Sequence, residues 1–180
     1  MKYLLDTNVV SYFLQSAREM ELAAAAAICP MVIVGEVRRE LELDKHRGGP
    51  SFTKWLASSN IDSADILVGS PAASTLGQLT KGTATGRDLG ERASIAMAAH
   101  DPSLTFVAND KSAMWIALRE LWEPGDRIVG VAPFLRRGFD AGAIDDPGVL
   151  DDVIALVPHQ RPTWWAAWRG SIATESGSTQ

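Results

Sequence analysis

The sequence contains very little cysteine and histidine. Its 180 residues include one cysteine, Cys29, and three histidines, His46, His100 and His159. A single cysteine excludes a disulfide framework and a cysteine-rich zinc site, and it points to a reducing cytoplasm. The three histidines have no motif-like spacing. We therefore look for chemistry that needs neither residue type.

Long hydrophobic runs and an excess of basic residues are also missing. The apolar N-terminus is broken at Asp6, and the alanine-rich segment 22–28 is too short to cross a bilayer. We therefore expect a soluble, cytoplasmic protein with no signal peptide and no membrane partner. The formal net charge of -5 argues against a protein that coats nucleic acid broadly. It does not exclude a nuclease whose acidic residues hold metal ions.

What remains is the pattern of a globular α/β protein. With 46% hydrophobic residues, a chain of 180 can bury one sizeable core. Apolar and β-branched runs predict strands at 2–5, 31–34, 61–68, 104–107 and 127–131, with helical patterns between them. This alternation predicts a three-layer α/β/α sandwich with a mostly parallel sheet of four to five strands.

The chain is expected to form one domain with an addition at its C-terminal end. We assign residues 1–141 to the α/β domain and residues 142–180 to a helical appendage. A helix is predicted over 145–157, and the small, polar residues from 173 onward are expected to fray.

Four acidic residues stand where the predicted fold leaves a strand or enters a helix. Asp6 and Asp110 follow the first and fourth strands, whereas Glu36 and Glu91 lie in the first turns of helices. Ligands of open α/β sheets collect beyond the carboxyl ends of the strands. Carboxylates that meet there repel one another unless a hard cation neutralises them. The pattern predicts an Mg²⁺ or Mn²⁺ site, and such a site suits phosphodiester hydrolysis by metal-bound water.

Short motifs surround these acids: Leu4-Leu5-Asp6-Thr7-Asn8, Glu36 after the second strand, Gly90-Glu91-Arg92-Ala93-Ser94-Ile95-Ala96-Met97-Ala98, and Ala108-Asn109-Asp110. As an ordered set over roughly residues 1–135, they resemble the PIN-domain family and are similar to the VapC toxins of bacterial toxin–antitoxin pairs. The resemblance implies a metal-dependent endoribonuclease in which Asp6, Glu36, Glu91 and Asp110 bind the cation. It also implies an RNA substrate, a small antitoxin partner and a homodimer.

Neighbouring polar residues are expected to support the four carboxylates through hydrogen bonds: Thr7, Asn8, Asp88 and Asn109. Each acid also has a structural interpretation. Asp6 and Asp110 could cap helices, and Glu36 could be a solvated helical charge. Glu91 lies three residues after Asp88, which is the spacing of a capping box, and Asp88 is the reserve candidate for the third carboxylate.

Basic and aromatic residues could contact RNA. Arg87, Arg92 and Lys111 lie next to the proposed acids and could bind phosphates, although surface solubility is the commoner reason for such residues. The tryptophans at 164, 165 and 168 could stack on bases. A stripe at helical spacing more often packs on a core or an interface.

Two other functions stay open at this stage. A non-catalytic PIN-like scaffold that binds RNA or protein is suggested by Ala93 and Ala108, which stand where many family members carry an aspartate and a small hydroxyl residue. An aspartyl-phosphate phosphatase would use Asp6 as the nucleophile. Such enzymes usually have a second acid two residues on, where this chain has Asn8.

Overall fold

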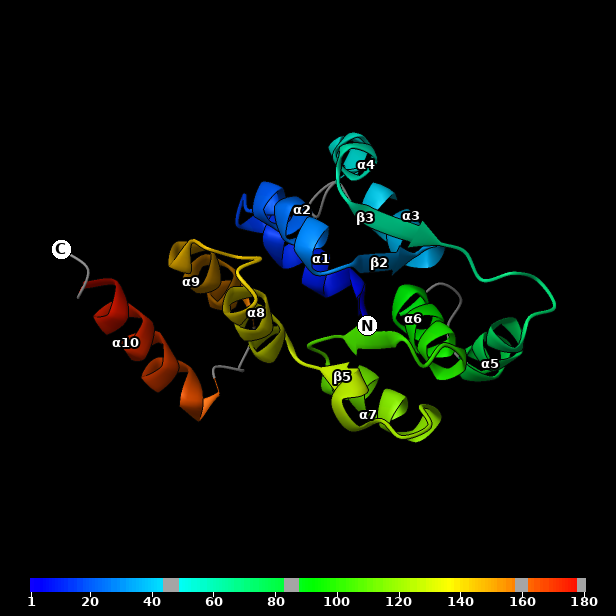
Figure 1. Cartoon of the computed structure of the whole chain (residues 1–180). Helices are drawn as coiled ribbons and strands as arrows, with labels where there is room; N and C mark the ends of the chain where they lie inside the picture. The colour runs from blue at the N-terminus through cyan, green and yellow to red at the C-terminus, as the bar shows by residue number, and fades with distance from the viewer. Residues whose placement is uncertain (44–48, 83–87, 158–161, 178–180) are drawn as a thin grey trace.

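The structure is a computed structural model that describes residues 1–43, 49–82, 88–157 and 162–177 (Figure 1). The predicted RNA contact Arg87 lies outside these residues, as do His46 and His159. No helix in the described ranges is both long enough and apolar enough to span a membrane.

One parallel sheet forms the centre of the molecule. Its strands are β1 (Lys2–Leu5), β2 (Met31–Val34), β3 (Ile61–Ala64), β4 (Leu104–Val107) and β5 (Ile128–Val129). They are arranged in the order β3-β2-β1-β4-β5, and each neighbouring pair is parallel. The three central strands are almost fully buried, as expected of a sheet that is covered on both faces.

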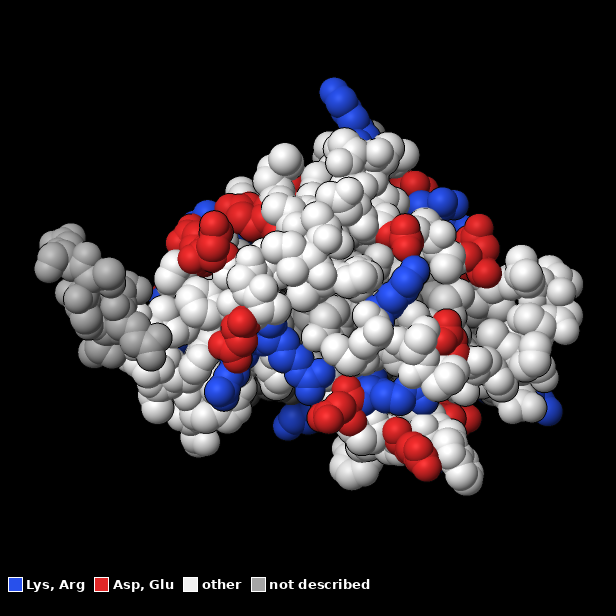
Figure 2. Space-filling view, in the orientation of Figure 1, with Lys and Arg blue, Asp and Glu red and all other residues white. Residues whose placement is uncertain are grey.

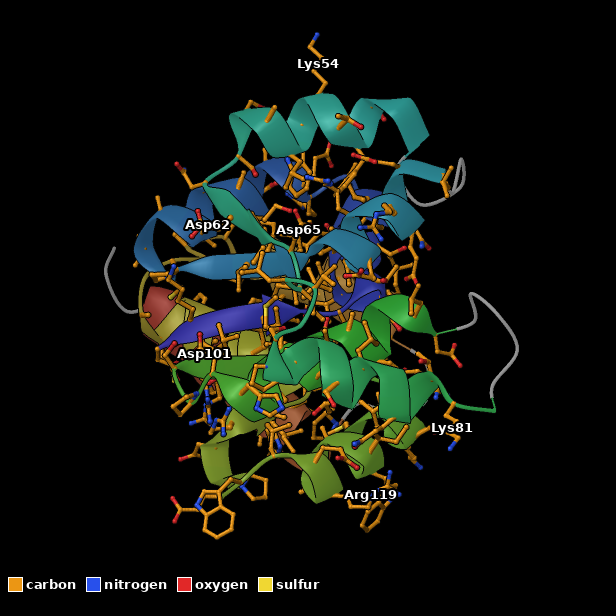
Figure 3. The ribbon with its side chains drawn as sticks, turned by 90° about the vertical axis from the view of Figure 1, so that its right-hand side faces the viewer. Lys54, Asp62, Asp65, Lys81, Asp101 and Arg119 are labelled. Atoms are coloured by element: carbon orange, nitrogen blue, oxygen red, sulfur yellow. The ribbon has the colours of Figure 1, made fainter. Side chains whose placement is uncertain are left out.

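Helices connect and cover the strands. They are α1 (Thr7–Gln15), α2 (Glu19–Ile28), α3 (Gly35–Leu43), α4 (Gly49–Ser58), α5 (Pro71–Thr80), α6 (Leu89–His100), α7 (Lys111–Glu120), α8 (Val131–Asp140), α9 (Pro147–Leu156) and α10 (Thr163–Gly177). Figure 1 shows α5 and α6 on one side of the sheet and α1, α2, α8 and α9 on the other. Figure 3 shows the sheet from the α5–α6 side, with Asp62 of β3 and Asp65 just beyond it. The predicted three-layer α/β/α fold is confirmed.

Several helices begin where the sequence places a capping residue. The Ser70 hydroxyl accepts a hydrogen bond from the Ala73 amide at 3.1 Å, and Pro71 follows as the first helical residue of α5. Asp146 accepts from the Gly148 amide at 2.7 Å at the start of α9, again with a proline at the first position. Such caps satisfy amides that have no partner within the helix.

The structure differs from the predicted elements in four places, one of which is the fifth strand, predicted over 127–131 and observed over 128–129. The third strand ends at Ala64 instead of extending to residue 68: the chain leaves the sheet after it, and Leu67 and Val68 are exposed. Residues 131–140 form α8, a helix that the sequence analysis did not predict. The predicted frayed end is helical as far as Gly177.

The tryptophans of α10 pack on α8. The ring of Trp168 meets Phe139 edge to face at 5.8 Å between centroids, and the Arg136 guanidinium lies 5.5 Å from the ring of Trp164. Trp165 is buried in the main core. The aromatic stripe therefore joins the end of the chain to the domain.

Candidate functional site

The strand order reverses between β1 and β4, and in open α/β sheets the carboxyl ends of two such strands border a crevice. The chain passes from β1 to β2 and β3 in one direction, then returns to place β4 on the other side of β1. At the carboxyl ends of these two strands, Leu5 lies opposite Val107, and the Asp6 amide donates to the Val107 carbonyl at 3.1 Å. Ligands of doubly wound sheets bind where the strand order reverses in this way. Asp6 and the segment 108–110 therefore stand at the position in the fold where a ligand is most expected.

Asp6 is a buried carboxylate at this crevice. Only 1% of its surface is exposed, and the Asn8 side-chain amide donates to its Oδ2 at 3.4 Å. Burial raises the pKa of Asp6 to about 6, and repulsion from Glu40 acts in the same direction. The amides of Thr7 and Asn8 lower the pKa but only partly offset the effect of burial. A charged Asp6 is thus costly in the protein as it stands.

Glu91 faces the same crevice from the first turn of α6. Its pKa is raised to about 8, mainly by burial and then by repulsion from Asp6, Asp110 and Asp88 in that order of strength. Arg92 acts in the opposite direction. Because Coulomb repulsion needs proximity, three carboxylates lie within electrostatic reach of Glu91, and two of them, Asp6 and Asp110, come from other parts of the chain.

The capping box that competed with this role for Glu91 is not formed. Asp88 adopts the left-handed backbone conformation, with φ of 55°, and its side chain makes no capping hydrogen bond to α6. The interpretation of Asp88 as a side-chain cap was therefore wrong, since capping residues typically have an extended backbone and Asp88 is left-handed.

Asp110 does act as a helix cap. Its Oδ1 accepts hydrogen bonds from the amides of Ser112 at 2.7 Å and Ala113 at 3.1 Å, which begins α7. Asp110 is exposed, whereas the preceding Asn109 is buried. Both capping bonds go to one oxygen of Asp110, so they restrict the orientation of its carboxylate.

Glu36 lies in the first turn of α3, where its side chain is 13% exposed. Its Oε1 accepts from the Arg39 guanidinium at 3.2 Å. Its Oε2 is buried and has no hydrogen-bond partner among the described residues. A buried carboxylate oxygen in this state is costly, and a cation would remove the cost.

The sequence analysis missed Glu40, which lies one helical turn beyond Glu36. Its carboxylate accepts hydrogen bonds from the Thr7 hydroxyl at 2.5 Å and from the Gly90 amide at 2.8 Å. Thr7 or Asn8 was expected to support Asp6: the Asn8 side chain does so, whereas the Thr7 hydroxyl donates to Glu40. The i, i+4 spacing of Glu36 and Glu40 was the sequence signal that both face the same side of the helix.

Asp6 and Asp110 both lie within electrostatic reach of Glu91. The three side chains are nevertheless not gathered into a coordination shell. Within the described ranges, no group of three or more histidine, cysteine, aspartate or glutamate side chains is arranged to hold a metal ion. Mutual repulsion keeps uncompensated carboxylates apart. Their side chains would have to move together around a cation.

The described residues include two of the three predicted RNA contacts. Arg92 is half-buried, and its guanidinium donates to the Leu79 carbonyl at the end of α5, which fastens α5 to α6. Lys111 is exposed at the start of α7, next to Asp110. Lys111 is therefore the better placed of the two to meet a phosphate near the crevice.

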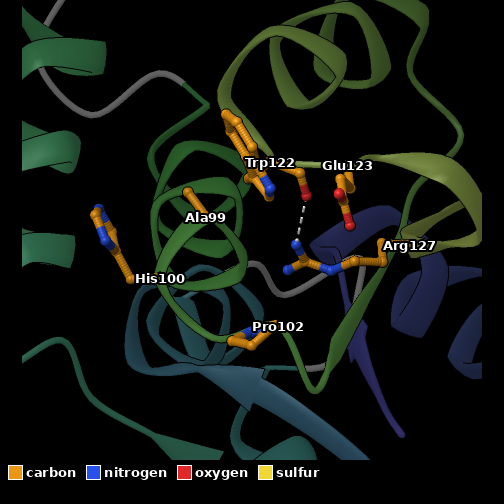
Figure 4. A pocket seen from close by; sticks show the side chains of 6 residues that line it. All are labelled: Ala99, His100, Pro102, Trp122, Glu123 and Arg127. Carbon is orange, nitrogen blue, oxygen red and sulfur yellow. Dashed lines mark hydrogen bonds between the residues drawn. The ribbon is translucent and has the colours of Figure 1, made fainter.

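A pocket of about 420 Å³ lies away from the carboxylates, where α6 ends and β4 begins (Figure 4). It is lined by Ala99, His100, Pro102, Trp122, Glu123 and Arg127. The Arg127 guanidinium donates to the carbonyl oxygens of Ala98, Asp101, Leu104 and Trp122. Because these carbonyls occupy the guanidinium, we assign Arg127 a structural role. The candidate site lies at the other end of the strands, beyond their carboxyl ends.

Comparisons of the chain with protein-family models, with curated proteins and with solved structures find no match. Its function is therefore inferred from the fold, the carboxylates and the sequence motifs.

Proposed function

We propose that the protein is a metal-dependent ribonuclease that hydrolyses phosphodiester bonds in RNA. One observation supports this proposal above the others: burial, followed by repulsion from Asp6 and Asp110 near the point where the strand order reverses, raises the pKa of Glu91. Carboxylates that repel one another at a ligand position favour a divalent cation.

The chemistry of the donors fits Mg²⁺ or Mn²⁺. Asp6, Glu91 and Asp110 offer carboxylate oxygens, which are the ligands that these hard cations prefer, and the unpartnered Oε2 of Glu36 is a further candidate. When bound, such an ion supplies an activated water and stabilises charge on the leaving oxygen. The chain itself orients the carboxylates: Asn8 donates to Asp6, and the first amides of α7 hold Asp110.

The surface charge favours local contact with a nucleic acid over broad coating. Figure 2 shows acidic and basic side chains interspersed over the face of the molecule that it draws, without a continuous basic band on that face. Lys111 beside Asp110 is the described cation that we propose for a substrate phosphate. The role of a toxin held by a small antitoxin, and a homodimer, are further proposals that rest on the PIN-like motifs. A short reading frame beside the gene that encodes a DNA-binding antitoxin would support the toxin role.

The proposal is tested with purified protein and a labelled single-stranded RNA. We expect cleavage with Mn²⁺ and none with EDTA, and we expect Asp6→Asn to abolish it. Asp126→Asn is the matched control, since its side chain is 95% exposed and pairs with Arg137 on the surface. Cleavage by Asp6→Asn at the wild-type rate would show that the activity comes from elsewhere. If the wild-type protein binds RNA without cutting it, the non-catalytic scaffold is the correct function.

A further inference from the structure

The Glu40 carboxylate forms hydrogen bonds with two residues that are each next to a proposed metal ligand in the sequence. Its Oε2 accepts from the hydroxyl of Thr7, which directly follows Asp6. Its Oε1 accepts from the amide of Gly90, which directly precedes Glu91. One carboxylate on α3 is thus bonded to the neighbours of two carboxylates that come from β1 and α6.

The contact is close enough to require glycine at position 90. A β-carbon added there would lie 2.7 Å from the Glu40 Oε2 and 3.0 Å from the Thr7 Oγ1. Atoms at these distances would have to move, so any other residue at position 90 would displace the Glu40 carboxylate from its two hydrogen bonds or push α6 away from it.

Glu40 also supplies the helix cap that α6 lacks. The first amides of a helix have no partner within it, and an anion at this end is favoured by the helix dipole. Asp88 makes no side-chain cap, whereas Glu40 accepts from the second residue of α6. A carboxylate from another helix therefore fixes where α6 begins, and Glu91 lies one residue further on.

We propose that Glu40 is a positioning residue that sets the separation of Asp6 and Glu91, an inference that rests on the ribonuclease function proposed above. Both oxygens of Glu40 already accept a hydrogen bond, so it acts through Thr7 and Gly90 and not on the substrate. A bridge of fixed length between the two ligand-bearing segments holds them in register for one cation.

Two substitutions separate the bridge from its charge. In Glu40→Gln, the amide oxygen can accept from Gly90 and the amide nitrogen can donate to the Thr7 hydroxyl oxygen, so the bridge is kept without the charge. In Glu40→Asp, the charge is kept, but the side chain is one methylene shorter and cannot reach both partners. We expect Glu40→Gln to keep kcat close to wild type. We expect Glu40→Asp to lose roughly 100-fold in kcat with little change in KM, since misplacement by about 1 Å can cost that much.

Hydrogen exchange at the Gly90 amide provides a readout that needs neither metal nor RNA. Exchange should be slow in the wild type and in Glu40→Gln, and faster in Glu40→Asp, because only the shorter side chain releases this amide. Thr7→Val, which keeps the shape of the side chain and removes the hydroxyl, is a second variant should Glu40→Asp fail to fold. Glu42→Ala is the control on the same helix, since Glu42 pairs with Arg38 at 3.8 Å and accepts from Thr53.

The outcomes distinguish this inference from the function on which it rests. If the wild type cleaves RNA, and Glu40→Asp and Thr7→Val cleave it equally well with unchanged Gly90 exchange, the positioning role is overturned and the ribonuclease stands. If the wild type does not cleave RNA with Mn²⁺, the ribonuclease proposal is overturned, and the positioning role is overturned with it. Loss of kcat in Glu40→Asp with recovery in Glu40→Gln supports both.

Discussion

Asp6→Asn should stabilise the metal-free protein while it abolishes activity. The pKa of Asp6 rises from 3.8 to about 6 in the folded protein, mainly through burial. A raised pKa means that the folded state prefers the neutral form of this group, so its charge works against folding. Asparagine has nearly the same shape and no charge, and it can still accept the hydrogen bond that Asn8 donates.

The size of the effect follows from the pKa. One pKa unit corresponds to about 1.4 kcal/mol, so a rise of about 2 units makes ionised Asp6 cost about 3 kcal/mol of unfolding free energy. The contribution of Asp6 is fully favourable below its unfolded pKa of 3.8 and is lost as pH rises through about 6. The advantage of Asp6→Asn is therefore close to zero at low pH and reaches about 3 kcal/mol at about pH 8. Removing the charge also lowers the pKa of Glu91, which adds stability in the same direction.

Urea unfolding in EDTA at a series of pH values measures this difference directly. For a chain of this size, 1 kcal/mol corresponds to about 2–4 °C in Tm, so thermal unfolding gives a second reading. Asp126→Asn should change the unfolding free energy by less than about 0.5 kcal/mol at every pH, as expected for an exposed surface pair. If Asp6→Asn is less stable than the wild type at about pH 8, or if its advantage does not depend on pH, a costly buried charge at Asp6 is refuted.

Three further predictions concern the same crevice. Mn²⁺ at about 100 times its Kd should stabilise the wild type by about 2.7 kcal/mol near pH 8, as measured by thermal unfolding. The stabilisation should be smaller near pH 5, because the carboxylates must lose protons to bind the ion, and smaller in Asp110→Asn at either pH. Gly90→Ala should cost about 1–3 kcal/mol in urea unfolding, since its new methyl group would press on Glu40; an unchanged midpoint would show that the contact is loose. Ser94→Ala should be neutral or stabilise by about 1 kcal/mol, because the Ser94 hydroxyl is buried without a partner among the described residues, and a clear loss in unfolding free energy would reveal one.

The strands could be predicted from sequence because each is a short apolar run. Residues 2–5, 31–34 and 104–107 were predicted to be strands with the bounds that the structure has. Strands that are buried on both faces of a sheet have continuous hydrophobic sequences, and such short runs are easy to recognise. The edge strand β3 was predicted too long, because the apolar residues 66–68 continue the strand-like pattern after the strand itself has ended.

Helix α8 was missed because its sequence gives conflicting local signals. The residues before it form β5, and Gly130 and Pro133 suggest a turn. Proline is tolerated in the first turn of a helix, where its missing amide has no partner within the helix in any case. Burial of Phe134 and Leu135 against the sheet then decides in favour of the helix, and Phe134 meets Tyr3 of β1 at 5.2 Å between ring centroids.

The Glu40 bridge could not be predicted because it depends on long-range packing. Glu40 is separated from Thr7 by 33 residues and from Gly90 by 50. Its side chain looks like any other charged position in a helix that also carries several glutamates and arginines. Only the packing of α3 against α1 and α6 reveals its two partners.

Asp110 and Glu91 each had a competing structural role in the sequence, and the structure decides the two cases in opposite ways. Asp110 caps α7, yet both capping bonds use Oδ1, so the cap orients the carboxylate without excluding a ligand. Glu91 had the stronger structural alternative in sequence, but the left-handed backbone at Asp88 removes the box that would have occupied it. Glu91 therefore has no capping role. Burial and three other acids raise its pKa to about 8, so its charged form destabilises the folded protein. Function is the better explanation for such a residue than stability, because a glutamine at position 91 would avoid the repulsion at once.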